Sequence, residues 1–481
     1  MSSTIDKKAL LAAFQREMDS DSVALFFGAG MSRPSGFVDW KALMQEVAED
    51  LGLDINRETD LIALAQFHKN RRKTRHRINQ LLVTEFTKGA TLSENHRLIA
   101  SLPISTVWTT NYDHLIEDAY AEAHKRPDVK KRPEDLAVSK PRSDVVVYKM
   151  HGDIDAPDEA VLTKEDYATF ESTRALFSIQ LRGHLVSKSF LFLGYSFSDP
   201  NLDYILARIR AQLGDKKREH FCVMKNVAKE GDMTEADVDY QRKKLTLRIE
   251  DLQNYGIQTL LIDDYAEITS LLHELNRRAV RKSVFISGSA HDPAPLGLEG
   301  LEKLARDLAK ELIKQDYNVV SGLGLGIGQA VTMGALEELY RAPASHLDDR
   351  LTLRPFPQVD PSKGTRAEVW ERYRQEMISR AGFAVFLAGN KLDPDTGKTV
   401  EAAGVLREFE IAVSQGAFPI PVGGSGHASK NIADTVAGNL DRYFGAHAPA
   451  VKKHFAVLGA LSELEKWVDA ILAIMKIVSP K

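Results

Sequence analysis

The sequence predicts an α/β protein built from two parallel β-sheets, each covered by helices on both faces. Short apolar runs, typical of buried strands, alternate with longer amphipathic stretches along most of the chain. The alternation begins again after a basic run at residues 277–282, and 481 residues suffice for two domains. We therefore expect one domain at residues 1–282 and a second at residues 283–481.

In the first half, a helical pattern leads into an apolar strand, and glycines or polar residues follow most of the later strands. The segment 124–142 is rich in Lys, Arg and Pro and is interpreted as a surface insertion. The basic stretch 69–77 is interpreted as a solvated helix face or a subunit contact. The expected strands cover residues 23–27, 106–110, 145–148, 189–194, 220–224 and 257–261, and the expected helices cover residues 10–18, 40–51, 60–88, 201–213 and 268–275.

The second half repeats the design with its own strands and helices. An apolar strand is expected at residues 283–289, followed by a long helix at residues 297–315. A strand at residues 318–320 leads through a glycine-rich loop into the helix that begins at residue 329. A further strand is expected at residues 383–389, which completes the signal for a second parallel sheet.

Composition excludes several classes of protein. Lys and Arg number 63 against 67 Asp and Glu, a net charge of -4, which gives no reason to expect binding to nucleic acid or to anionic membranes. Cys222 is the single cysteine, so neither a disulfide framework nor a multi-cysteine zinc site fits, and no spacing of metal ligands predicts a metal. Without a signal-peptide core or an apolar run of about 18–20 residues, we expect a cytoplasmic protein.

The strand ends of the first half carry a candidate site. Gly28-Ala29-Gly30-Met31-Ser32 follows the first strand and fits either a phosphate-holding loop or a plain tight turn, because Arg33 replaces the third glycine of a dinucleotide fingerprint. Asn111-Tyr112-Asp113, His151-Gly152-Asp153 and the segment 194–200 follow other strands. Ligands of such sheets gather at the carboxyl ends of strands, so we expect these segments to meet at one edge. Segment 194–200 is either a simple turn or a wall for an adenosine ribose.

These motifs resemble the ordered NAD-site motifs of sirtuins. The resemblance implies a Rossmann-like, sirtuin-type sheet that binds NAD+ as substrate, with Asn111 and His151 as catalytic residues beside the nicotinamide ribose. Deacylase sirtuins carry four zinc cysteines that this chain lacks, and the sirtuin-like NAD hydrolases of bacterial defence systems are more similar. The NAD-binding residues implied by the resemblance are Gly28, Ala29, Gly30, Ser32, Asp113, Gly194 and Ser196.

The chemistry of NAD+ cleavage suggests a role for each side chain. Nicotinamide leaves as a neutral base, so the ribose passes through an oxocarbenium-like state, much as in glycoside hydrolysis. We expect Asn111 to orient the ribose and a water, and His151 to act as a base toward a ribose hydroxyl or that water, a role worth about 10²–10⁴ in rate. Asp113 either orients the site or caps the next helix.

The second half carries a second nucleotide pocket. Glycines alternate through residues 322–328 at a strand end, and Ser287-Gly288-Ser289 ends the preceding strand, so two loops converge at one edge. This order of elements resembles the SLOG superfamily, a Rossmann-like α/β fold. The catalytic Pro-Gly-Gly-x-Gly-Thr loop of the wider group is absent around residues 403–410, which favours binding without turnover. The expected ligand contacts are Ser287, Gly288, Gly324, Gly326, Arg372, Lys391 and Glu408, although Arg372 fits a solvent-facing position equally well.

A sirtuin-like half joined to a SLOG half resembles the effectors of the Thoeris anti-phage system. The resemblance implies an NAD+ hydrolase that yields ADP-ribose and nicotinamide, and that a cyclic ADP-ribose isomer made by a TIR-domain partner activates. It also implies a homotetramer or a higher assembly. Two other readings stay open, an NAD-dependent protein deacylase and a non-catalytic nucleotide-binding scaffold.

Overall fold

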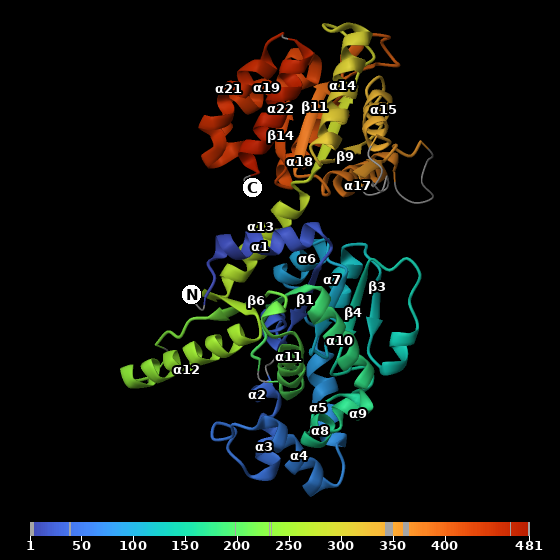
Figure 1. The fold of residues 1–481 in the computed structure, drawn as a ribbon. Helices are drawn as coiled ribbons and strands as arrows, with labels where there is room; N and C mark the ends of the chain where they lie inside the picture. The colour runs from blue at the N-terminus through green and yellow to red at the C-terminus, as the bar shows by residue number, and fades with distance from the viewer. Residues whose placement is uncertain are drawn as a thin grey trace. The chain divides into compact units, whose positions relative to one another are not determined.

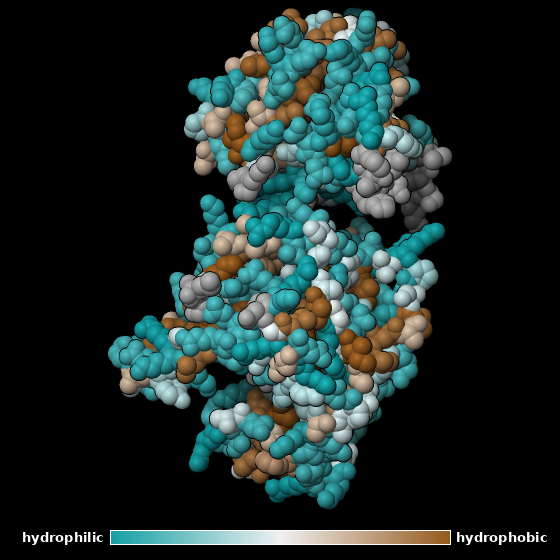
Figure 2. All heavy atoms as spheres, in the orientation of Figure 1, coloured by the Kyte–Doolittle hydropathy of each residue, from teal (hydrophilic) through white to brown (hydrophobic). Residues whose placement is uncertain are grey.

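The computed structural model describes residues 4–37, 40–197, 199–229, 231, 233–341, 350–358, 365–461 and 463–479. The chain divides into two compact units, Met1–Asn276 and Arg277–Lys481 (Figure 1). Within the described ranges, no helix combines the length and the apolar composition needed to span a bilayer. On the face shown in Figure 2, hydrophilic side chains predominate and the apolar ones form scattered patches.

A parallel sheet forms the centre of the first unit. Among the described residues its strands follow the order β3-β4-β2-β1-β5-β6-β7, and every neighbouring pair is parallel. The predicted α/β class is therefore confirmed for this half. The strands are β1 (Val23–Phe27), β2 (Thr106–Thr109), β3 (Pro127–Lys130), β4 (Val145–Lys149), β5 (Ser189–Leu193), β6 (His220–Lys225) and β7 (Ile257–Ile262).

The interpretation of segment 124–142 as a surface insertion is wrong for part of its length. β3 lies within it and forms the edge of the sheet, paired with β4. Asp128 and Lys130 on this strand are both buried and form an ion pair at 2.8 Å. Because two of the four residues of β3 are charged, a prediction based on apolar runs did not identify this strand.

Helices cover both faces of this sheet (Figure 1). α10 and α11 share one apolar core with Phe26 and Trp108, whereas α1 packs on β1 and β5 and places Phe14 against Phe221. The described helices of the unit are α1 (Lys7–Asp19), α2 (Trp40–Leu43), α3 (Gln45–Leu51), α4 (Leu61–Arg72), α5 (His76–Phe86), α6 (Glu94–Ser101), α7 (Leu115–Glu122), α8 (Lys164–Ala168), α9 (Phe170–Thr173), α10 (Ala175–Ser187), α11 (Pro200–Leu213), α12 (Glu235–Asn254) and α13 (Ala266–Val280).

Helices α2–α5, here called the helical cap, have a small apolar core of their own. The predicted helix over residues 60–88 is two helices, because the chain turns at Lys73, whose φ is 58°. The cap core also takes in Tyr112 and Leu162, which follow β2 and β4. The cap therefore packs directly on the strand-end segments that carry the candidate site.

The basic stretch 69–77 lies in this cap and is held by internal ion pairs. Four of its six Lys and Arg side chains pair with acidic residues of the same unit, so most of the charge of this helix surface has a partner within the unit. The pairs are Lys69–Glu165, Arg72–Asp50, Arg75–Asp166 and Arg77–Glu46.

The second unit also has a central parallel sheet, as predicted. Its described strands follow the order β10-β9-β8-β11-β14, and β12 and β13 form a separate hairpin. The strands are β8 (Ser283–Ser289), β9 (Asn318–Ser321), β10 (Leu351–Leu353), β11 (Phe383–Ala388), β12 (Asn390–Leu392), β13 (Thr399–Glu401) and β14 (Phe418–Pro421), and the helices are α14 (Gly297–Lys314), α15 (Gly328–Leu339), α17 (Arg366–Ile378), α18 (Ala403–Ser414), α19 (His427–Gly438), α20 (Leu440–Phe444), α21 (Ala448–Gly459) and α22 (Leu464–Val478).

Candidate functional site

The predicted site residues of the first unit meet at the carboxyl edge of the sheet. β4, β2, β1 and β5 are consecutive neighbours, so the segments that follow them lie side by side. Thr109 of β2 is in register with Lys149 of β4, and Asn111 and His151 each come two residues later. The two proposed catalytic residues therefore come at the same distance past the ends of two adjacent strands.

Gly28 and Gly194 pack against each other where β1 and β5 end. The amide of Gly28 donates to the carbonyl of Leu193 at 3.1 Å, and the amide of Gly30 donates to the carbonyl of Gly194 at 3.0 Å. A Cβ on Gly28 would lie 2.4 Å from the Gly194 carbonyl oxygen, and Gly194 has a φ of 62°. These glycines are required by the contact between the two loops.

The loop after β1 continues as two short 3₁₀ turns, Ala29–Met31 and Arg33–Ser35. Ala29 and Gly30 are exposed at its outer side, while Ser32 is buried. In the segment after β5, Ser196 is exposed as well, and Ser198 lies outside the described residues.

A chain of hydrogen bonds joins Asn111, Ser32 and Asp113. The Asn111 side-chain amide donates to the Gly28 carbonyl at 3.1 Å and to Ser32 Oγ at 2.9 Å, and Ser32 Oγ donates to Asp113 Oδ2 at 2.7 Å. The other oxygen of Asp113 accepts the amide of Leu115, the first residue of α7, at 3.1 Å. Asp113 thus binds both the first amide of α7 and the Ser32 hydroxyl beside Asn111.

Behind this chain lies a small cavity of about 10 Å³, close to the space of one water molecule. Asn111, Asp113 and His96 contribute to its lining. His96 is 4% exposed, and burial lowers the pKa of its imidazole. Sequence reasoning missed His96, which carries no signal beyond its place in an amphipathic helix.

His151 sits in an aromatic pocket at the end of β4. Its ring meets the rings of Tyr167 and Phe170 edge to face, with centroids 5.4 and 6.1 Å away. Its Nε2 lies 2.9 Å from Oδ2 of Asp199, at the N-terminus of α11, although the two groups do not have the angles of a hydrogen bond. Asp199 belongs to segment 194–200, for which the sequence left open a simple turn or a ribose wall, and its contact with His151 was missed.

Lys149 ties together the segments after β2 and β4. Its side chain is fully buried, and Nζ donates to the carbonyls of Tyr112 at 3.1 Å and Asp113 at 2.6 Å. The same ammonium pairs with Glu117 at 3.0 Å and with Asp153. One cation therefore holds the segments that follow β2 and β4 together.

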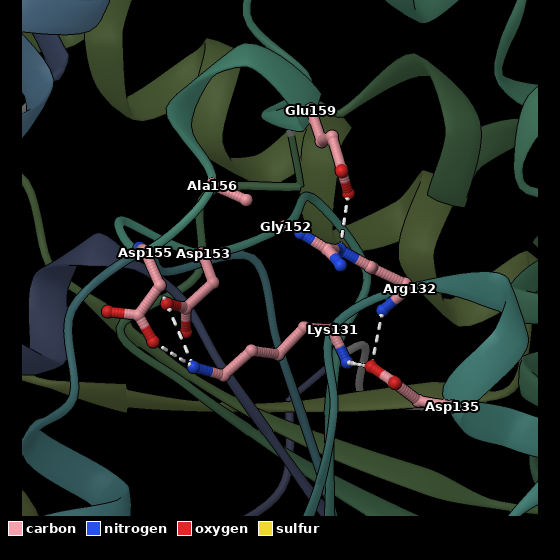
Figure 3. Close-up of a pocket in the computed structure, with 8 residues that line it drawn as sticks. All are labelled: Lys131, Arg132, Asp135, Gly152, Asp153, Asp155, Ala156 and Glu159. Carbon is pink, nitrogen blue, oxygen red and sulfur yellow. Dashed lines mark hydrogen bonds and ion pairs between the residues drawn. The ribbon is translucent and has the colours of Figure 1, made fainter.

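Beside these groups is a cavity of about 160 Å³ next to Gly152 (Figure 3). This volume lies below the roughly 300 Å³ at which small-molecule sites begin, so it does not match a dinucleotide. Figure 3 shows Lys131 reaching toward Asp153 and Asp155 on its floor, and Arg132 directed at Glu159.

His114, Asp153 and Asp155 present ligand atoms within 4.8 Å of one another, a spacing that a metal could use. Ammonium groups already stand there, however. Lys131 Nζ is 3.1 Å from Asp153 Oδ1 and also pairs with Asp155, and Lys149 contacts the other Asp153 oxygen. Burial by itself raises the pKa of Asp153, but the His114 hydrogen bond and the Lys149 charge hold it well below its ordinary value. We interpret the cluster as an ion-pair network.

In the second unit, Ser287 and Glu408, two of the predicted ligand contacts, lie next to each other. Ser287 Oγ donates to Glu408 Oε2 at 2.6 Å, and both residues are buried. Arg374 Nε approaches the other oxygen of Glu408 at 3.4 Å, and its guanidinium lies 4.9 Å from the ring centroid of Phe356. Burial raises the pKa of Glu408 against the opposing effects of Ser287 and Arg374.

The other predicted ligand contacts of this unit do not lie beside Ser287 and Glu408 as one cluster of side chains. The side chain of Arg372 is 68% exposed and faces Glu376, and Lys391 is exposed on the β12–β13 hairpin. A Cβ on Gly324 would lie 1.9 Å from the Gly288 carbonyl oxygen, and one on Gly326 would lie 2.7 Å from that of Ala290. These glycines bring the loops after β8 and β9 into contact. Arg374, two residues from Arg372, was missed.

Two family models match this chain, one for each of its two units. Residues 105–257 match the model of the SIR2-like domain, and residues 267–478 match the Sir2- and TIR-associating SLOG family. The chain is 43% identical to the NAD(+) hydrolase ThsA of Bacillus cereus (strain MSX-D12), covering 97% of each chain. It is 42% identical to the NAD(+) hydrolase ThsA of Cytobacillus dafuensis, over 98% of this chain and 96% of that one. It is 40% identical to the protein of the same name in Enterococcus faecium, over 98% and 99%.

Proposed function

The chain belongs to the NAD(+) hydrolase ThsA family, and from this premise we propose that it cleaves NAD+ between nicotinamide and ribose, releasing nicotinamide and ADP-ribose. The observation that carries the proposal is that Asn111 and His151 each follow, by two residues, the registered pair Thr109 and Lys149 that ends two adjacent parallel strands. Acting in the cytoplasm, such an enzyme would deplete NAD+ as an anti-phage defence.

The hydrogen bonds of Asn111 suggest how it acts. Both hydrogens of its side-chain amide are used, one by the Gly28 carbonyl and one by Ser32 Oγ. Its Oδ1 is therefore the atom left to accept a hydrogen bond from a ribose hydroxyl or from the attacking water. Asp113 supports this arrangement, because it accepts from Ser32 and fixes which way the hydroxyl points.

His151 would supply the base. Departure of nicotinamide leaves positive charge at the ribose C1′, and a hydroxyl or water that gives up its proton completes the hydrolysis. The aromatic rings around His151 limit access of solvent to it. Three further polar atoms near this edge are buried without a hydrogen-bond partner among the described residues, which fits a site completed by a polar substrate: Ser35 Oγ, Tyr195 Oη and Asn201 Nδ2.

The second unit would regulate the first. Ser287, Arg374 and Glu408 form a buried polar cluster at the carboxyl edge of its sheet, where ligands of such sheets bind. We take the activator to be a cyclic ADP-ribose isomer made by a TIR-domain partner, in line with the matched family of TIR-associating SLOG domains. Arg374 would contact the pyrophosphate, and Glu408 a ribose hydroxyl.

A homotetramer or higher assembly completes the proposal. Leu176, Ile179 and Val186 lie along one side of α10 and are 50%, 59% and 46% exposed. An apolar stripe of this kind favours association with another subunit. Sedimentation of the full chain would measure the subunit number, and a strictly monomeric protein would contradict this part.

A nicotinamide-release assay on the full chain, with cyclic ADP-ribose isomers added in turn, tests the activity. Asn111→Ala and His151→Ala should each lower the activated rate by about 10²-fold or more. His76→Ala is the matched control, because His76 is an exposed residue of the helical cap. Wild-type rates in both site variants, with the fold intact, would remove the assignment.

A further inference from the structure

We propose that Asp199 is a positioning residue for the reaction: its carboxylate holds Nε2 of His151 and thereby leaves Nδ1 as the base that faces the substrate. This inference rests on the proposed NAD+ cleavage and deepens it. It makes the catalytic group a His–Asp pair drawn from two separate strand ends.

The geometry begins with distance and burial. His151 Nε2 and Asp199 Oδ2 are 2.9 Å apart, and their side chains are 4% and 6% exposed. Neither atom has a hydrogen-bond partner among the described residues, so this close approach is the polar contact that each of them makes there. Because a buried polar atom without a partner costs about 1–3 kcal/mol, the two groups have a strong reason to bond to each other.

The second oxygen of Asp199 is fixed by the helix that it begins. Oδ1 accepts the amide of Asn201 at 2.8 Å and that of Leu202 at 3.4 Å, so the carboxylate caps α11. The cap leaves Oδ2 directed at the imidazole. Burial alone would raise the pKa of the Asp199 carboxyl, but the charge of the nearby His151 and the two amides outweigh it and bring the pKa below its ordinary value. Asp199 is therefore an anion that can only accept.

An acceptor at Nε2 selects the tautomer of the ring. The proton of neutral His151 must sit on Nε2, which leaves the lone pair on Nδ1. A carboxylate plays the same part toward histidine in Ser-His-Asp enzymes, where it orients the ring and stabilises the imidazolium. In NAD+ cleavage the lone pair on Nδ1 would take the proton of the ribose hydroxyl or of water.

Asp199→Asn tests this with little change of structure. Asn is as good a helix cap as Asp, and its Oδ1 must keep accepting from Asn201. The capping bond therefore turns the new NH₂ group toward His151, where it donates to Nε2 and drives the ring proton to Nδ1. Asp60→Asn is the matched control, since Asp60 caps α4 by accepting from Ala63 and touches no histidine.

We expect Asp199→Asn to lower kcat by about 10²–10⁴-fold and to change KM by less than about 3-fold, while Asp60→Asn leaves both unchanged. In ¹⁵N-histidine spectra of the full chain, with the signal assigned through His151→Gln, His151 should change from the Nε2–H to the Nδ1–H tautomer. An unchanged tautomer, or an unchanged kcat in Asp199→Asn, would overturn the proposal.

The activity assay and the tautomer measurement together distinguish a failure of the proposed function from a failure of the positioning role. If the wild-type chain releases no nicotinamide under any condition, the proposed function fails, and the tautomer still decides whether Asp199 controls His151. If the wild-type chain is active and the tautomer stays the same, the positioning role fails and the proposed function stands. Circular dichroism on both variants confirms that the helices are retained.

Discussion

Replacing Lys149 by Met should destabilise the first unit more than any other single change of a lysine there. The ammonium is fully buried and serves two carbonyls and two carboxylates, so its loss leaves several groups unsatisfied. Asp153 would keep His114 at 2.9 Å and Lys131 at 3.1 Å, but no other cation is paired with Glu117 among the described ion pairs. Breaking a buried ion pair on one side costs about 3–5 kcal/mol, and we expect a loss of that size.

The variant leaves Glu117 as the uncompensated charge. Burial already raises the pKa of that carboxyl, and Lys149 opposes the rise. Removing the carboxylate in Glu117→Gln/Lys149→Met should therefore recover at least about 1 kcal/mol, as expected for coupled neighbours. Asp153 needs no such rescue, because the Lys131 ammonium and the hydrogen bond with His114 remain beside it.

Hydrogen exchange followed by mass spectrometry on the full chain measures the effect where it occurs. A loss of about 3–5 kcal/mol corresponds to roughly 10²–10⁴-fold faster exchange of the most protected amides in peptides covering β2 and β4. Lys131→Met is the matched control, since Lys131 pairs with the same Asp153 but is 30% exposed, and it should cost less than about 1 kcal/mol. Equal acceleration in Lys149→Met and Lys131→Met would refute the reasoning.

Three further outcomes are expected. Gly194→Ala should abolish nicotinamide release and lower the melting temperature more than Gly36→Ala, because both sites have positive φ but only at Gly194 would the new Cβ meet backbone, at 2.6 Å. Burial, together with the charge of Arg218, lowers the pKa of the His220 imidazole to about 3. Between pH 7 and pH 5, therefore, only the unfolded chain binds a proton at this residue, and the free energy of unfolding should fall by about 2 kcal/mol. Thermal melting of His220→Gln at the two pH values should show a smaller fall in stability than the wild-type chain. Arg374→Ala should raise the activator concentration needed for half-maximal hydrolysis by about 10- to 100-fold, while Arg372→Ala leaves it unchanged; equal responses would remove Arg374 from the pocket.

The apolar strands were predictable because burial on both faces leaves a continuous hydrophobic run, as at residues 189–193. Strand β3 was not predictable, because its burial depends on the ion pair between Asp128 and Lys130, and no local sequence pattern indicates that pair. The break at Lys73 was hidden in the same way, since it depends on one backbone conformation inside a helical pattern. Local periodicity therefore identified the sheets better than their edges and caps.

In the candidate site, too, some residues were predictable from the sequence and others were not. Asn111 and His151 were recognisable because each follows a strand, and strand ends converge. The contact between His151 and Asp199 joins residues far apart in the chain, and only the fold brings them together. Arg372 and Arg374 lie on one charged helix, where residues two apart face different directions, so sequence alone could not choose between them.

The close contacts between glycines at neighbouring strand ends affect how the sequences of relatives of this chain should be interpreted. In each unit, a glycine at one strand end fills the space where a side chain would strike a carbonyl of the neighbouring strand end, Gly28 against Gly194 and Gly324 against Gly288. A descendant that had lost all activity would still need these glycines in order to fold. Their persistence in a genome therefore marks the architecture alone, and surviving enzymes are better sought through the polar residues that line the same edge.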